Sequence, residues 1–352
     1  MMPRTVHEIA GWDGKGLPGP ATCVALTQDL IEARAARTVG IAARRLNLED
    51  AGLRTTITVT ARRLPDSAPP PEACSGVLVE IEPAWAQPPI WHALQRARGP
   101  MTDLHLLSAL DRQRDDDGHI VSKAGGDAVY VDVLARTFAI AASTTVLCLL
   151  LALPTAQLLV SVSPSVSRLL MLALLLPLWT SVLVRSAAWL VLLQKNGLVN
   201  QALMWLGVIS EPLALIYNRT GVLIALIHVL LPFAVLPISQ SMRSLPPSQM
   251  RAASSLGAPP WTSFWRVYLP QIIPGMSAGG MLVFILALGY YVTPLLLGGA
   301  GDQLLPFYIA YNATQTVNWG LASALGGVLL LATLLMYALY VRLVGVHRVG
   351  LG

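Results

Sequence analysis

The chain has 352 residues, of which 54% are hydrophobic and 12% are charged, and its formal net charge at pH 7 is +5. Its length alone would suggest about two soluble domains, but its mean hydropathy of +0.59 indicates a membrane protein. Only two acidic residues, Glu211 and Asp302, follow Asp132, and the later arginines stand between apolar segments and not on an aromatic-rich basic face, so nucleic acid is not an expected partner.

Residues 1–136 carry most of the charge and are expected to form a separate, α-rich region. Apolar residues recur at near-helical spacing over residues 24–46, which predicts one amphipathic helix. The sequence further predicts a short strand over residues 77–82 and a helix that begins at proline over residues 88–98.

This region offers few groups for chemistry. Of the three cysteines, Cys23 and Cys74 could form a disulfide in an oxidising compartment, which the sequence leaves open, and Cys148 is expected to be a core residue. No cysteine or histidine spacing supports a metal or redox site. Residues 115–118 (Asp-Asp-Asp-Gly) lack the ligand spacing of an EF-hand and are expected to form a solvated turn. Residues 14–16 lack the hydroxyl of a P-loop, so we expect no ATP hydrolysis by a P-loop in this chain. No catalytic constellation stands out in the sequence, and we expect neither a catalytic site nor a cofactor.

Five apolar segments are long enough to cross a hydrocarbon core about 30 Å thick as helices. They cover residues 138–162, 169–193, 221–239, 272–297 and 321–344. Prolines inside the first four predict kinks, which membrane helices tolerate. The expected fold is therefore an all-α membrane protein, with a transmembrane domain over residues 137–346 and a short tail over residues 347–352.

The charged residues in the short loops predict the orientation. One side carries Arg168, Arg243, Arg251, Arg266, Arg342 and Arg348, and the other side carries only Lys195 and Arg219. The positive-inside rule predicts that the first side is cytoplasmic, and the C-terminal tail lies on that side. An odd number of spans then places residues 1–136 outside the cytoplasm, although residues 1–20 contain no apolar segment that could direct their export. We therefore expect a sixth transmembrane helix ahead of residue 1, whether a late start assignment or a truncation accounts for its absence.

The loop over residues 240–270, on the cytoplasmic side, is too regular for a simple linker. Prolines precede a short alanine-rich helix over residues 249–256, Gly257 permits a chain reversal, and residues 261–269 form an amphipathic segment that leads into Pro270. The alternative interpretation is a generic amphipathic linker.

This loop resembles that of type I ABC importer permeases, which reads Glu-Ala-Ala, then Gly, then Ile-x-Leu-Pro. Ala252, Ala253, Gly257, Leu269 and Pro270 match the pattern, and Arg251 replaces the glutamate. Such permeases seat this coupling helix in a groove of an ATPase subunit. The resemblance therefore implies an ATPase contact made by Met250, Arg251, Ala252, Ala253, Leu256, Gly257, Ala258, Leu269 and Pro270. Because Arg251 reverses a charge, either the ATPase partner has changed to match or coupling is weakened.

Residues 176–200 are similar to the third span and following loop of spermidine/putrescine permeases, where an aromatic-Thr-Ser sequence, an arginine and a later tryptophan recur. The resemblance to the type I (MetI-like) fold covers about residues 130–345, and it implies that residues 1–136 are an insertion between the first and second helices of the family. Candidates for the translocation pathway are Trp179, Thr180, Arg185, Tyr290, Tyr291 and Thr293, although the aromatic residues could equally be interfacial anchors and Arg185 could be structural. The small residues at 275, 279 and 280 predict close helix packing.

The resemblance implies a permease subunit of a bacterial importer that is driven by ATP and works by alternating access in the inner membrane. Its expected partners are ABC ATPase subunits, a second permease, an extracytoplasmic solute-binding protein and the lipid bilayer, and its expected cargo is a small solute such as a polyamine. Alternatives are permeases for iron, thiamine or amino-acid derivatives. A gradient-driven carrier is disfavoured because no predicted span contains an acidic residue that could relay protons or sodium ions.

Overall fold

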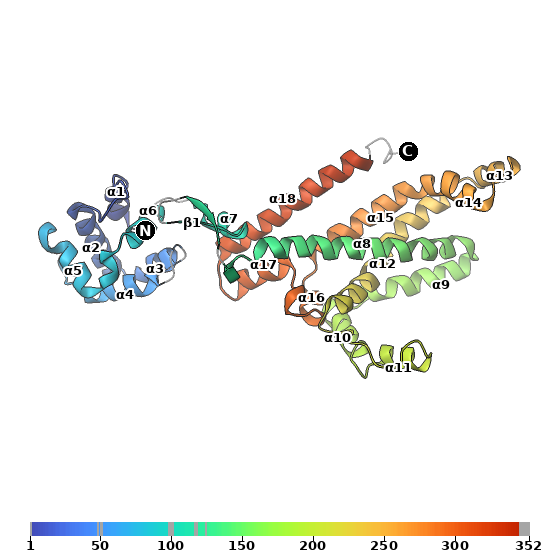
Figure 1. Cartoon of the computed structure of the whole chain (residues 1–352), viewed down its shortest axis with the longest axis horizontal. Helices are drawn as coiled ribbons and strands as arrows, with labels where there is room; N and C mark the ends of the chain where they lie inside the picture. The colour runs from blue at the N-terminus through green and yellow to red at the C-terminus, as the bar shows by residue number, and fades with distance from the viewer. Residues whose placement is uncertain are drawn as a thin grey trace. The chain divides into compact units, whose positions relative to one another are not determined.

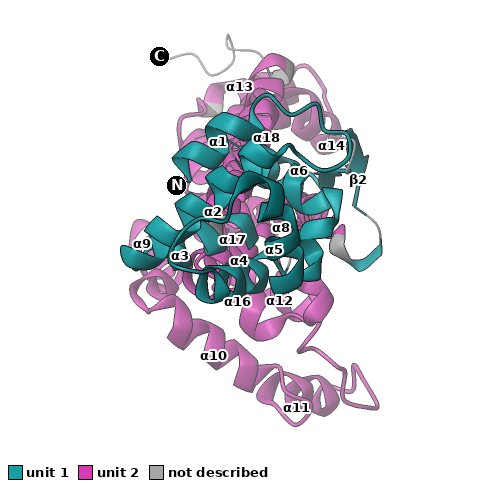
Figure 2. Ribbon diagram, turned by 90° about the vertical axis from the view of Figure 1, so that its left-hand side faces the viewer, with its two compact units in different colours: residues 1–127 teal, residues 128–352 magenta. Residues whose placement is uncertain are grey.

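The computed structural model describes residues 2–47, 49, 52–97, 102–115, 119–123 and 125–344 of the chain. It divides into two compact units, Met1–Asp127 and Ala128–Gly352 (Figure 2). The division lies ahead of the boundary expected at residue 136, because the first long helix begins at Tyr130, upstream of its apolar segment. The tail 347–352 and residues 116–118 of the predicted turn lie outside the described residues.

Unit 1 is a group of short helices with one two-stranded hairpin. Its elements are α1 (Pro3–Ile9), α2 (Pro20–Ala35), α3 (Val39–Asn47), α4 (Leu53–Arg63), α5 (Pro71–Ile81), η1 (Pro83–Ala86), α6 (Pro88–Arg96), α7 (Leu104–Ala109), β1 (Arg112–Arg114), β2 (Ile120–Ser122) and η2 (Gly125–Asp127). Helices α1, α2, α5 and α6 begin with proline at N1 or N2, where a helix makes no use of the missing N–H. The strands β1 and β2 pair antiparallel. The unit is α-rich, as expected.

Two local predictions in unit 1 are wrong. The single helix expected over residues 24–46 is divided into α2 and α3 near Arg37, whose φ of +57° is incompatible with a continuing helix. The strand expected over residues 77–82 belongs almost entirely to α5, where Cys74 and Leu78 are buried one helical turn apart. The contact that these two side chains make with the core therefore favours the helix over the strand.

Two tryptophans lie at the centre of the unit 1 core. Trp85 and Trp91 are almost fully buried with ring centroids 5.1 Å apart, and Trp85 Nε1 donates to Thr60 Oγ1 over 2.9 Å. The Cys23–Cys74 disulfide, which the sequence left open, joins α2 to α5 within the same core. Unit 1 thus has a hydrophobic core and a covalent cross-link of its own.

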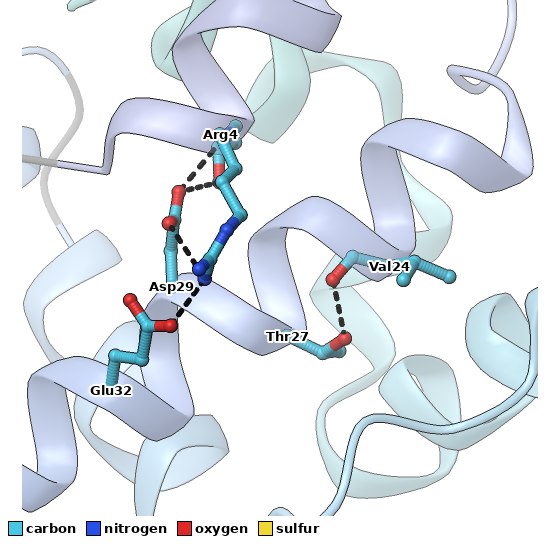
Figure 3. Close-up of polar contacts among 6 residues, drawn as sticks. Arg4, Val24, Thr27, Asp29 and Glu32 are labelled. Atoms are coloured by element: carbon cyan, nitrogen blue, oxygen red, sulfur yellow. Dashed lines mark hydrogen bonds and ion pairs between the residues drawn. The ribbon is translucent and has the colours of Figure 1, made fainter.

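A buried carboxylate joins α1 to α2 (Figure 3). Asp29 Oδ2 accepts hydrogen bonds of 2.8 Å from the backbone N–H and from the hydroxyl of Thr5. Arg4 Nη1 donates to Glu32 Oε1 over 2.6 Å and lies 4.0 Å from Asp29 Oδ1. Asp29 therefore satisfies one of the backbone donors that the first turn of α1 leaves free.

Unit 2 consists of long helices joined by short ones. Its elements are α8 (Tyr130–Ser161), α9 (Pro164–Leu175), η3 (Leu176–Trp179), α10 (Val182–Leu192), α11 (Leu198–Trp205), α12 (Arg219–Arg243), α13 (Pro247–Ser255), α14 (Pro260–Ser263), η4 (Phe264–Tyr268), α15 (Leu269–Gly289), α16 (Val292–Leu297), η5 (Ala300–Asp302), α17 (Leu305–Thr314) and α18 (Trp319–Val344). Helices α8, α12 and α15 lie side by side and form its centre, whereas α18 packs mainly against α17 (Figure 1).

Four helices in the described part of unit 2 are long and apolar enough to cross a membrane. They are Tyr130–Ser161, Arg219–Arg243, Pro260–Gly289 and Trp319–Arg342. A fifth span results only if Pro164–Trp179 and Val182–Leu192, which are bent by 103°, are counted together. The expected all-α membrane fold is confirmed, but its second span is broken.

Two expected spans are interrupted where the backbone becomes extended. Thr180 has ψ 150°, and Ser181 then starts α10 by accepting a hydrogen bond of 3.2 Å from the Val184 N–H. In the segment expected to run to residue 297, the helix ends at Gly289 because Tyr290 is extended, and α16 follows as a separate helix. Both breaks lie where polar side chains gather.

The small residues of α15 allow the close packing that the sequence predicts. A Cβ added to Gly275 would lie 2.5 Å from Ser241 Cβ, and one added to Gly279 would lie 2.9 Å from the Ala234 carbonyl oxygen. Gly280 faces Leu149 of α8 in the same way, at 3.2 Å. Gly275 and Gly279 let the backbones of α15 and α12 approach closely, and Gly280 lets α15 pack against α8, as van der Waals packing in lipid requires.

Candidate functional site

The loop between α12 and α15 lies at the end of the bundle away from α16 and α17 (Figure 1). It consists of α13, α14 and the π-helical turn η4, which continues directly into α15. Helix α13 contacts α14 and η4. The loop therefore projects as a folded element, and the alternative of a generic linker is not favoured.

Gly257 ends α13 and reverses the chain. Its φ is +79°, its N–H donates to the Ser254 carbonyl over 3.0 Å, and the Ala258 N–H donates to the Ala253 carbonyl over 3.1 Å. These bonds satisfy carbonyls that the last turn of a helix leaves free, and the left-handed conformation favours glycine. The sequence thus fixes a sharp turn after the alanine-rich helix.

The short helix α13 presents a distinct exposed surface. Leu256 is 88% exposed, Arg251 and Ala252 are exposed, and Met250, Ala253 and Ala258 are half-buried. The side chains of Leu256 and Arg251 are therefore both open to solvent in this chain. Leu269 does not belong to this surface, because it packs against the core of the bundle, and Pro270 lies beside it at the start of α15.

Both ends of the loop are joined to α8 by side-chain hydrogen bonds. Arg243 Nη2, at the end of α12, donates to the Leu159 carbonyl over 3.0 Å and to Ser167 Oγ over 2.9 Å. Tyr268, at the end of η4, donates its hydroxyl to Gln157 Oε1 over 2.6 Å. The two ends of the loop are therefore tied to α8 as well as to α12 and α15.

A second group of polar residues lies where α10, α12 and α16 meet. Ser186 Oγ and Thr293 Oγ1 are 3.1 Å apart and both side chains are buried. Arg185 Nη2 donates to the Thr180 carbonyl over 2.7 Å, and Arg185 lies beside the Tyr290 hydroxyl. Arg185 is therefore buried and held by hydrogen-bond partners.

His228 of α12 belongs to this group and was not singled out from the sequence. Its Nδ1 accepts a hydrogen bond of 3.1 Å from Trp189 Nε1, and the two rings meet edge to face with centroids 5.2 Å apart. A single histidine inside an apolar span is a recognisable signal of a functional or buried polar position. Only the fold, however, brings Trp189 of α10 to it.

The structure brings together four of the predicted pathway residues and separates two. Thr180, Arg185, Tyr290 and Thr293 belong to the polar group described above. Trp179 is 83% exposed and Tyr291 is also exposed, unlike the buried Arg185 and Thr293. In the described residues, no cluster of three or more histidine, cysteine or acidic side chains could hold a metal ion.

A bundle of apolar helices of membrane-spanning length with a folded, projecting loop is the architecture expected of a transport permease. The comparisons with known proteins agree. Residues 135–345 match the family model of the binding-protein-dependent transport system inner membrane component, and the chain belongs to that family. It is therefore a permease subunit of an ABC importer and a multi-pass protein of the inner membrane.

The chain is similar to permeases named for different solutes. It is 33% identical over 216 residues to the spermidine/putrescine transport system permease protein PotB of Escherichia coli (strain K12), covering 61% of this chain and 78% of that protein. It is 29% identical over 216 residues to a permease protein named for 2-aminoethylphosphonate transport, PhnU of Salmonella paratyphi A, covering 60% and 73%. The crystal structure of a bacterial alginate ABC transporter in complex with a periplasmic protein is 16% identical, with a TM-score of 0.49, and covers 60% of this chain and 77% of that chain.

Proposed function

We propose that this chain forms half of the translocation pathway of an ATP-driven importer that works by alternating access. The observation that carries the proposal is the geometry of α13, which projects with an exposed leucine and is connected to α8 through both ends of its loop. Nucleotide-driven movement of an ATPase subunit at α13 would then move the three central helices. The required partners are two ATPase subunits, a second permease and an extracytoplasmic solute-binding protein.

The proposed ATPase contact comprises Met250, Arg251, Ala252, Ala253, Leu256, Gly257 and Ala258, with Leu269 and Pro270 as the base of the loop. A cross-linking experiment tests it. Leu256→Cys in the assembled transporter should form a cross-link to the cognate ATPase, whereas Val317→Cys, which is exposed on unit 2 between α17 and α18, should not. Failure of Leu256→Cys to cross-link in every nucleotide state would contradict the proposal.

Because Arg251 replaces the glutamate of the family motif, we infer that the ATPase carries a matching change of charge. The exposed guanidinium would favour an acidic group in the groove that receives α13. Arg251→Glu should therefore lower receptor-stimulated ATP hydrolysis, and a basic residue placed at the acidic position of the ATPase should restore it. Full activity of Arg251→Glu with the natural ATPase would instead indicate that this charge contributes nothing to coupling.

We infer that the cargo is a polyamine such as spermidine or putrescine, because the similar permease PotB is named for these solutes. No residue between Glu211 and Asp302 is acidic, so selection of a polycation would come mainly from the separate solute-binding protein. Mass spectrometry of the ligands that the cognate binding protein retains tests this inference. Retention of a phosphonate, iron, thiamine or an amino-acid derivative would replace the polyamine and leave the importer mechanism intact.

We infer that residues 1–136 lie outside the cytoplasm, as an insertion between the first and second helices of the family. The Cys23–Cys74 disulfide supports this placement, because such bonds persist in oxidising compartments. Arg62→Cys, exposed on α4, should react with a membrane-impermeant maleimide in whole cells, whereas Leu256→Cys should be protected. Protection of Arg62→Cys would overturn the topology.

A further inference from the structure

An aromatic row lies at the base of the coupling loop, formed by Trp261, Phe264, Trp265 and Tyr268. Its rings are in continuous contact: the centroids of Trp261 and Trp265 are 5.5 Å apart, those of Phe264 and Trp265 are 5.7 Å apart, and those of Phe264 and Tyr268 are 5.8 Å apart. Trp261 is 72% exposed and Trp265 is 49% exposed. A contiguous aromatic patch of this kind marks contact with a membrane or another protein.

The length of the helix places this row at the edge of the bilayer. The helix Pro260–Gly289 has 30 residues, including α14, η4 and α15, and at about 1.5 Å per residue it is about 45 Å long. The hydrocarbon core is only about 30 Å thick. About ten residues therefore exceed the core. We assign them to the start of the helix, because the first ten residues contain the aromatic row and Arg266, whereas residues 281–289 at its other end contain no charged residue.

The local chemistry matches the headgroup region. Tryptophan and tyrosine are enriched at membrane interfaces, where the ring is apolar and the N–H or O–H meets water. Arg266 is exposed on the same segment, and no acidic residue occurs between Glu211 and Asp302. A basic segment without acidic neighbours is attracted to anionic lipid headgroups.

The aromatic row continues directly into the spanning helix, whereas the turn at Gly257 separates it from α13. In η4 the Leu269 N–H donates to the Phe264 carbonyl, five residues back, which widens the helix by one π turn just before Pro270. Proline lacks an N–H, so this turn allows the helix to continue through Pro270 without a break. The row is thus a direct extension of α15, which must enter the bilayer, whereas α13 lies beyond Gly257 and carries its own exposed surface.

We propose that Trp261, Trp265 and Arg266 lie among the headgroups of the cytoplasmic leaflet, so that the aromatic row anchors the coupling loop to anionic phospholipid. The proposal rests on the orientation and coupling role given above. Helix α13 contacts α14 and η4, so the anchor links the position of α13 to the membrane surface. An ATPase that moves α13 would then act on a segment whose other end is held at the membrane surface.

Quenching of tryptophan fluorescence by brominated lipids tests the proposal. The full chain, without ATPase or binding protein, is placed in nanodiscs of phosphatidylcholine and phosphatidylglycerol. The emission of Trp261 and Trp265 is obtained by subtracting the emission of the Trp261→Phe/Trp265→Phe variant from that of the wild type. The emission of Trp12 in unit 1, obtained in the same way from the Trp12→Phe variant, is the matched control and should not be reduced by either lipid. Lipids brominated close to the headgroup should reduce the Trp261/Trp265 emission about twofold or more, and lipids brominated at the chain ends should reduce it less, as expected for rings at headgroup depth.

The proposal would be overturned if brominated lipids left this emission unchanged and aqueous iodide quenched it only in the absence of the ATPase. That result would identify the row as a protein-docking surface. The measurement needs no transport activity, so it separates failure of the anchor from failure of the proposed function. As a second readout, Trp261→Ala/Trp265→Ala should lower receptor-stimulated ATP hydrolysis several-fold, whereas Trp261→Phe/Trp265→Phe should retain most of it. Equal activity of the two variants would show that the aromatic rings do not hold the loop.

Discussion

The turn at Gly257 provides the sharpest test of how the coupling loop is built. Its φ of +79° lies in the left-handed region, and a Cβ added there would meet no atom within 4 Å. Replacement by alanine is therefore penalised by backbone conformation alone, by about 1–2 kcal/mol. A penalty of this size reduces the population of the native turn about 5–30-fold relative to its alternatives. Asparagine tolerates the same conformation better, so Gly257→Asn should be damaged less than Gly257→Ala although its side chain is larger.

The assay is receptor-stimulated ATP hydrolysis by the complete transporter reconstituted in lipid, with the yield of folded permease as a control for insertion. Gly257→Ala should insert normally and lose most of the stimulation, and Gly257→Asn should lie between it and the wild type. Wild-type stimulation in Gly257→Ala would show that the ATPase does not depend on this turn. If the loss followed side-chain size, with asparagine worse than alanine, side-chain bulk and not backbone conformation would control the turn.

Three further predictions concern packing, the disulfide and the polar group. Gly275→Ala should lower the melting temperature, because its Cβ would lie 2.5 Å from a neighbouring side chain and overpacking costs about 1–3 kcal/mol. Gly326→Ala, whose Cβ would meet open space, is the matched control. Equal melting temperatures for the two variants would contradict close packing at Gly275. Replacing Cys23 and Cys74 by serine removes a cross-link between residues 51 apart in sequence and should lower the free energy of unfolding of unit 1 by about 4 kcal/mol. Proteolysis of unit 1 at increasing urea concentration measures this loss. An unchanged urea midpoint would refute the predicted loss. His228→Ala leaves the Trp189 indole N–H without its acceptor, which costs about 1–3 kcal/mol, and it should slow transport while basal ATP hydrolysis persists. His228→Gln keeps an acceptor and should have a milder effect. Normal transport by His228→Ala would show that His228 is not part of the pathway.

The two sequence patterns with strong local causes predicted the structure well. Alanines before Gly257 and prolines around the loop specify a short helix with a left-handed end, and the structure has that helix and that turn. Residues 88–98 begin with proline after a break, and α6 covers most of that range. In both cases the neighbouring residues alone fix the backbone.

Predictions that depended on distant contacts were less accurate. Residues 77–82 have the composition of a strand, but the packing of Leu78 in the core of unit 1 makes them part of α5. The apolar segment 169–193 was long enough for one span, yet the chain bends there by 103°. Hydropathy measures only the composition of a segment, and it contains no information about where a polar backbone finds partners inside the protein.

From the sequence alone, the membrane character, the positions of the apolar segments and the coupling-loop motif could be determined, because each depends on composition or on residues that are neighbours in the chain. The tertiary structure decided that Cys23 meets Cys74, that Arg243 and Tyr268 join the loop to α8, and that His228 meets Trp189. These pairs lie between 39 and 111 residues apart in sequence, so their contact depends on how whole helices pack against one another. No local pattern encodes that packing.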